Sequence, residues 1–145
     1  LIYLTDAVPA GILFVHGNRS KAMYIEIDFN SDEAIYMQLR NQIIAAIATS
    51  QLKEGESLPS VRNLADNIGV NMHTVNKAYS SLRQDGFLKV DRRRGAVVAV
   101  DIDKLHFLNK MKVLLQPVVI SGIVKGISRE EAKGLIDDIY DELGF

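Results

Sequence analysis

The chain has 145 residues, of which 48% are apolar and 24% charged, a composition typical of one globular domain or of one domain plus an appendage. It contains no cysteine, which excludes disulfides, zinc–thiolate sites and cysteine nucleophiles and fits a reducing cytoplasm. No run of about 20 uninterrupted apolar residues is present, so we expect no membrane partner, and the net charge of −1 excludes a wholly basic surface but not a basic face.

Residues 1–22 are apolar in patches and are interrupted by Asp6 and Pro9. They lack the basic start and the continuous apolar block of a secretory signal. Met23 opens a more regular sequence, so we interpret residues 1–22 as an upstream extension, with an additional strand or arm as the alternative. We expect little chemistry from this segment in either case.

The next region predicts a strand and a helix. Residues 24–29 alternate between polar and apolar side chains, which is typical of a short strand with Ile25, Ile27 and Phe29 on its buried face. Apolar residues then recur at three- and four-residue spacing from residue 34 to residue 50, which predicts an amphipathic helix.

Two shorter helices are predicted next, and both have clear boundary residues. Ser60 and Asn71 are suited to cap the first turns of these helices. Gly69 tolerates a left-handed backbone and ends the first of them, and Asp85 and Gly86 close the second. Their predicted buried stripes consist of Val61, Leu64, Ala65 and Ile68, and of Val75, Ala78, Tyr79 and Leu82.

A two-stranded ribbon follows the helices. Residues 87–90 and 96–100 are short β-type segments, and the turn between them contains Arg92, Arg93 and Arg94. This pattern predicts a β-hairpin with a basic tip.

The last 45 residues predict two helices. Residues 101–125 have a helical pattern with Pro117 inside it, which we expect to kink or divide the helix. Residues 128–131 form a capping box that opens a final helix with one acidic side. We expect their apolar residues to pair with a second copy of the chain: Leu105, Leu108, Met111, Leu115, Val118, Val119, Leu135, Ile136 and Ile139.

The order helix, short turn, helix, β-ribbon predicts a winged helix-turn-helix over residues 23–100, a mostly α fold with a small β-wing (α+β), followed by a helical dimerisation arm over residues 101–145. In such domains the second helix enters the DNA major groove. Residues 60–95 carry seven lysines and arginines and three acids, so this segment has a charge of +4 and the remainder −5. The segregation predicts a basic DNA-reading head whose affinity depends on salt.

Three segments carry a family resemblance. Residues 34–39 (Ala-Ile-Tyr-Met-Gln-Leu) resemble the P-L-Y-x-Q-I helix of GntR-type regulators, and residues 55–65 resemble that family's G-x-x-L-P-S-x-R-x-L-A motif. Residues 71–79 are similar to the YtrA-like subgroup, which implies a short two-helix dimerisation region. The match covers roughly residues 34–100 and departs from the family at two places. Met72 stands where many members have arginine, and Arg92-Arg93-Arg94-Gly95 replaces the usual G-x-G wing tip.

The DNA-binding residues are predicted from chemistry and resemblance together. Short polar side chains at the start of the second helix suit base edges, and the arginine turn suits the minor groove or phosphates. The resemblance places Arg62 on DNA, whereas the alternative for each residue is a helix cap or a solvated surface position. We also expect the rings of Tyr36 and Tyr79 to lie in the core with their hydroxyls at the surface. The predicted DNA-binding set is Ser60, Arg62, Asn71, His73, Thr74, Asn76, Lys77, Arg92, Arg93, Arg94 and Gly95.

These features predict a homodimeric transcription regulator, most simply a repressor, that binds a palindromic double-stranded operator. Two alternatives stay open: a switch with a small-molecule effector between the C-terminal helices, for which the sequence offers no support, and a winged helix that docks only proteins. His16, His73 and His106 show no metal-ligand spacing, and we find no catalytic set. We therefore expect no enzyme activity and no cofactor.

Overall fold

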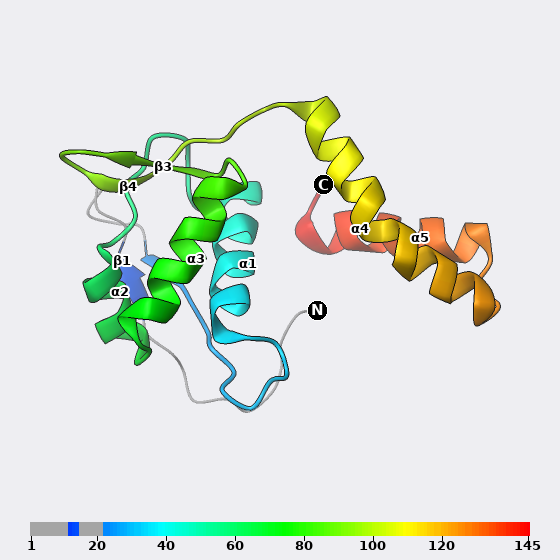
Figure 1. The fold of residues 1–145 in the computed structure, drawn as a ribbon, viewed down its shortest axis with the longest axis horizontal. Helices are drawn as coiled ribbons and strands as arrows, with labels where there is room; N and C mark the ends of the chain where they lie inside the picture. The colour runs from blue at the N-terminus through cyan, green and yellow to red at the C-terminus, as the bar shows by residue number, and fades with distance from the viewer. Residues whose placement is uncertain (1–11, 15–21) are drawn as a thin grey trace. The chain divides into compact units, whose positions relative to one another are not determined.

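The computed structural model describes residues 12–14 and 22–145, so residues 1–11 and 15–21, most of the predicted upstream extension, lie outside the described part. The chain divides into two compact units, with the boundary between Asp101 and Ile102 (Figure 1). Each unit is described separately below.

The first unit is a winged helix-turn-helix, which confirms the predicted fold class. Its elements are β1 (Ile12–Phe14), β2 (Ala22–Tyr24), α1 (Ile35–Ala48), α2 (Val61–Ile68), α3 (Met72–Gln84), β3 (Leu88–Asp91) and β4 (Gly95–Val98). Strands β1 and β2 pair antiparallel with Ile12 opposite Tyr24, and strands β3 and β4 pair antiparallel with Leu88 opposite Val98.

The segment before α1 is extended, but the predicted strand over residues 24–29 is wrong beyond Tyr24. Ile25 and Ile27 are buried as predicted, whereas Phe29 is exposed. Two glutamine side chains of α1 supply the backbone partners that a neighbouring strand would have supplied. Gln42 accepts from the Glu26 amide (2.9 Å) and donates to the Glu26 carbonyl (2.5 Å).

Gln38 binds the same segment one helical turn earlier. Its side-chain oxygen accepts from the Asp28 amide (2.9 Å), and its nitrogen donates to the carbonyls of Asp28 and Glu33 (both 2.9 Å). Gln38 is itself buried. The glutamine of the quoted motif therefore fixes the approach of the chain to α1.

Substituting Gln38→Leu is expected to lower the free energy of unfolding by about 1–2 kcal/mol, because backbone groups of Asp28 and Glu33 lose their partners in a half-buried position. Urea denaturation monitored by circular dichroism measures the change. Gln84→Leu, on the exposed face of α3, is the matched control and should shift the midpoint little. Equal midpoints for the two variants would contradict the assigned role of Gln38.

The core lies where α1, α2 and α3 meet the wing. The helix boundaries follow the predicted capping residues. The Ser60 hydroxyl accepts from the Asn63 amide (3.1 Å), and the Asn71 side chain accepts from the His73 amide (2.8 Å). Gly69 ends α2 in the left-handed conformation at φ 69°. The largest fully buried side chains are Ile25, Leu39, Ile43, Leu52, Leu64, Leu82, Val75, Val97 and Val98.

A polar link fixes α3 to α1. The Arg40 guanidinium donates to the Asp85 carboxylate (2.6 Å) and to the Ser81 hydroxyl (3.2 Å), and the Arg40 and Asp85 side chains are less than one-fifth exposed. The charge-assisted bond is of the stronger class because it is partly shielded from water. It fixes the C-terminal half of α3 against α1.

A third extended segment joins the wing sheet, and it was not predicted from the sequence. Residues 55–58 run antiparallel beside β4, where the Gly55 amide donates to the Val98 carbonyl (2.9 Å) and the Leu58 amide donates to the Ala96 carbonyl (2.8 Å). The loop that leads into α2 is therefore part of the wing sheet, so the wing and the start of α2 are held together.

The second unit consists of α4 (Lys104–Val124) and α5 (Arg129–Leu143). Pro117 does not divide α4, which is continuous across it, and the Ser121 hydroxyl donates to the Pro117 carbonyl (2.9 Å). The predicted capping box is confirmed by reciprocal bonds between Ser128 and Glu131. Neither helix has a buried side chain, so their apolar residues are uncovered within one chain.

Candidate nucleic-acid interface

Helix α3 presents a polar face to solvent along its whole length. Its buried face carries the four residues predicted for it. His73, Asn76 and Lys77 are exposed on the other face, while Thr74 is only half-buried and therefore less accessible than predicted. Met72, at the position where arginine is frequent, is 51% exposed. Polar side chains thus project from α3 in the arrangement that reading base edges requires.

The start of α2 lies at one end of this surface. Ser60 and Arg62 are both exposed there. The Ser60 hydroxyl satisfies the Asn63 amide, and the amides of the first helical turn point out of the helix end. Helix N-termini of this kind attract phosphate oxygens.

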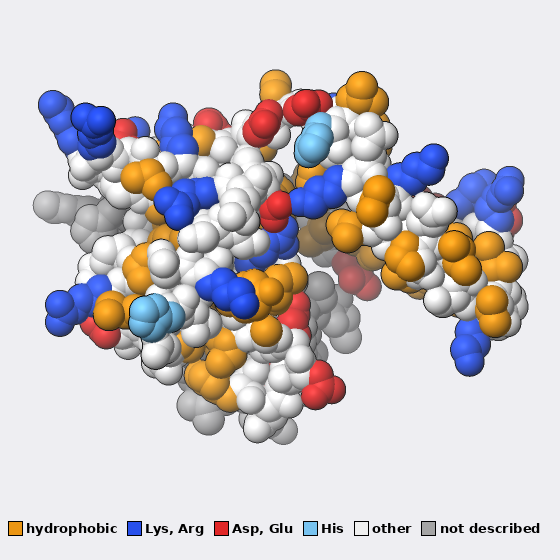
Figure 2. All heavy atoms as spheres, viewed as in Figure 1, with side chains coloured by type: hydrophobic (Ala, Val, Ile, Leu, Met, Phe, Trp, Pro, Cys, Tyr) orange, Lys and Arg blue, Asp and Glu red, His pale blue; other side chains and the backbone are white. Residues whose placement is uncertain are grey.

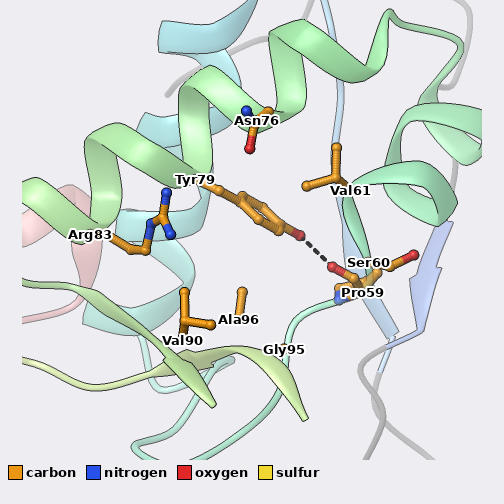
Figure 3. Close-up of a pocket in the computed structure, with 9 residues that line it drawn as sticks. All are labelled: Pro59, Ser60, Val61, Asn76, Tyr79, Arg83, Val90, Gly95 and Ala96. Atoms are coloured by element: carbon orange, nitrogen blue, oxygen red, sulfur yellow. Dashed lines mark hydrogen bonds between the residues drawn. The ribbon is translucent and has the colours of Figure 1, made fainter. Parts of the chain in front are cut away.

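A groove of about 280 Å³ separates α3 from the wing (Figure 3). Tyr79 forms its floor, and its hydroxyl donates to the Pro59 carbonyl (2.9 Å) instead of reaching the surface as predicted. Burial raises the pKa of Tyr79, so the phenol stays a hydrogen-bond donor even in alkaline solution. The lining residues are Pro59, Ser60, Val61, Asn76, Tyr79, Arg83, Val90, Gly95 and Ala96. An apolar floor with Ser60 and Arg83 at the rim suits a sugar–phosphate strand.

Sequence reasoning missed Arg83 as a candidate site residue. Figure 3 shows Arg83 on the wing side of α3, and its guanidinium donates to the Ser80 hydroxyl (3.0 Å). Arg83 lies seven residues after Asn76, which is two helical turns along the same face. Helical periodicity carried through to the end of α3 would have identified it.

The wing tip is an ordered turn built on Asp91. The Asp91 carboxylate accepts from the amides of Arg93 (2.8 Å) and Arg94 (2.9 Å). The Arg94 guanidinium donates to the Gly55 carbonyl (3.1 Å) and lies 3.7 Å from Asp91. All three arginines are exposed at the wing tip, where Lys and Arg side chains gather in Figure 2, but the Arg94 guanidinium is engaged in bonds within the wing.

The two backbone bonds, first from Arg93 and then from Arg94, hold the pKa of the Asp91 carboxyl below its usual range. A lowered pKa means that the order of the turn is present above about pH 4 and is lost as the pH falls through the lowered value. Asp91→Ala is expected to remove the protection of the Arg93 and Arg94 amides from solvent exchange at every pH, as measured by nuclear magnetic resonance.

Asp91→Asn is the matched variant because it keeps the accepting oxygen. It should retain most of the amide protection and abolish its loss in acid. Protection in Asp91→Ala equal to that of the unsubstituted chain would refute the role of Asp91.

The described residues contain no group of three or more His, Asp or Glu side chains placed to hold a metal ion. His73 lies on the α3 surface and His106 lies in α4. His16 falls outside the described residues.

Comparison with known proteins gives the family. Residues 33–98 match the model of the bacterial regulatory proteins of the gntR family. The chain is 31% identical over 118 residues to the HTH-type transcriptional repressor YtrA of Bacillus subtilis, covering 79% of this chain and 91% of that protein.

Two solved structures extend the likeness beyond the head. One is a transcriptional antiterminator from Listeria monocytogenes (TM-score 0.74, 30% identity, covering 86% of this chain and 94% of that one). The other is YtrA from Sulfolobus acidocaldarius, a GntR-family transcription factor (TM-score 0.58, 42% identity, covering 66% and 97%). The chain is therefore a DNA-binding transcription regulator of the GntR family, and it is similar to the family's YtrA-type members.

Proposed function

We propose that this regulator is a homodimeric repressor that binds an inverted-repeat operator. The observation that carries the proposal is the polar face of α3 beside an arginine-tipped wing, within a segment of net charge +4. That surface complements the charge and the groove dimensions of duplex DNA. A protein-docking face would be more apolar.

The residues of the head divide by the kind of contact they suit. Asn76 and His73 are placed for base edges in the major groove. The α2 start, with Ser60 and Arg62, is placed for the backbone. The groove between α3 and the wing suits the sugar–phosphate backbone that separates the major and minor grooves of the DNA. Arg92 and Arg93 are placed for the minor groove.

The arm supports dimerisation. Apolar side chains of α4 are widely exposed within one chain, for example Leu105 at 70% and Val118 at 66%. The charges of the two helices are complementary: α4 carries three lysines and no acid, whereas α5 carries six acids and two basic residues. Helices of opposite charge from two copies are expected to pack into a shared apolar core.

Helix α4 is also long and apolar enough to cross a membrane by length and composition. Lys110 and Lys112 lie within it, and a charge inside a bilayer costs several kcal/mol. A second copy covers the apolar face and leaves both lysines in water. We therefore assign the face to a dimer in the cytoplasm, with a two-fold axis that presents two α3 helices to half-sites about one DNA turn apart.

Selection from a random DNA duplex pool, followed by sequencing and a salt titration, tests the proposal. We expect an enriched inverted repeat and an affinity that falls steeply as salt rises. A dimer bound to such a site within a promoter would occlude the promoter, which would account for repression. An unenriched pool with a flat salt response would refute operator binding.

A further inference from the structure

The exposed face of α3 contains one cation whose position is set by another helix. The Lys77 ammonium lies 3.9 Å from the centre of the Tyr36 ring, which belongs to the first turn of α1. Tyr36 is half-buried and Lys77 is exposed. The distance is well within the range of a cation–π contact.

We propose that Tyr36 is a positioning residue that holds Lys77 for a DNA phosphate at the α1 edge of the recognition face. The inference rests on the proposed operator binding and deepens it. A lysine has four rotatable side-chain bonds, and ordering them on binding opposes affinity. The ring orders the side chain before DNA arrives, so less freedom remains to be lost in the complex.

The ring attracts the ammonium through one side only. An ammonium has three hydrogens, so the side away from the ring keeps donors for a phosphate oxygen. The contact thus orders the Lys77 side chain and leaves its positive charge available to DNA. An ion pair with a carboxylate would instead neutralise that charge.

The ring is fixed by the register between α1 and α3. Tyr36 and Arg40 are four residues apart on α1, and their partners Lys77 and Ser81 are four residues apart on α3. The Arg40 link to Ser81 and Asp85 therefore holds the two helices in the one register at which the ring meets Lys77.

A double-mutant cycle with Tyr36→Leu and Lys77→Ala, on the full chain with random-sequence duplex DNA, tests the inference. For each head bound, Tyr36→Leu should weaken binding about 3- to 5-fold, and Lys77→Ala should also reduce the salt slope by about 0.9. The double variant should bind as weakly as Lys77→Ala alone. Tyr36→Phe keeps the ring and should bind like the unsubstituted chain.

A second measurement needs no DNA. The Lys77 side-chain methylene next to the ammonium should show an upfield ring-current shift in the nuclear magnetic resonance spectrum of the free protein, and Tyr36→Leu should remove it. An absent shift, or a loss from Tyr36→Leu that persists in the Lys77→Ala background, overturns the positioning role. If the shift is present but the unsubstituted chain binds no duplex, the proposed function is refuted. The claim that Lys77 is held for a DNA phosphate then fails with it, although the contact between Tyr36 and Lys77 stands.

Discussion

Leu115→Asp is expected to convert the regulator into a monomer and to weaken its binding to a two-half-site operator at least about 100-fold. Leu115 belongs to the apolar face of α4 that the proposed dimer covers. A carboxylate buried there without a partner costs several kcal/mol, and two-fold symmetry places it in the interface twice. Sedimentation at micromolar concentration measures the mass, and titration of single and paired half-sites separates the loss of pairing from damage to the head.

Gln116→Asp is the matched control, because Gln116 is already polar and its side chain lies about 100° around the helix from Leu115. It adds the same charge and should leave both mass and operator affinity unchanged. A Leu115→Asp chain that sediments as a dimer, or a control that dissociates equally, would rule out the apolar face of α4 as the interface.

The parts of the fold that local rules govern could be predicted from the sequence. Ser60, Asn71 and Ser128 cap their helices as expected, because a side-chain oxygen next to free amides needs no distant partner. The buried stripe of α3 follows helical periodicity, and Gly69 ends α2 because its backbone is left-handed there.

The errors lie where distant residues decide. Residues 25–28 alternate like a strand, yet the backbones of Glu26 and Asp28 bond to the side chains of Gln42 and Gln38, ten or more residues away. No local sequence pattern predicts these side-chain to backbone bonds. The edge formed by residues 55–58 beside β4 was missed for the same reason. Pro117 leaves α4 undivided, because one missing backbone bond in a 21-residue helix leaves the bonds on either side intact.

The candidate site was predicted as a set of residues but not as a geometry. The fold brings Asn76, the start of α2 and the wing strands around one groove, and Tyr79 forms its floor with its hydroxyl bonded to the Pro59 carbonyl. The sequence offers no means of telling that Arg94 bonds to the Gly55 carbonyl within the wing, although it is exposed like Arg92. That difference is what makes the wing testable residue by residue.

Replacing Arg92 and Arg93 together with alanine is expected to weaken binding to a single half-site about 30-fold at 0.15 M salt and to reduce the slope of log affinity against log salt by about 1.8 for each head bound. Each arginine that neutralises a phosphate or enters the minor groove releases about 0.9 counterion, which is worth about 1 kcal/mol at that salt concentration. Fluorescence anisotropy over a range of salt concentrations gives both quantities.

The double variant Arg129→Ala with Lys133→Ala removes the same charge from α5, which carries none of the proposed DNA contacts, and should leave the slope unchanged. Arg94→Ala should behave differently from either variant. Its guanidinium donates to the Gly55 carbonyl, so its loss should loosen the wing tip and lower affinity with a smaller change in slope than Arg92 and Arg93 produce. Equal slopes for the wing and α5 variants would mean that the wing tip stays off the DNA, and α3 with the α2 start would then carry the whole electrostatic contribution.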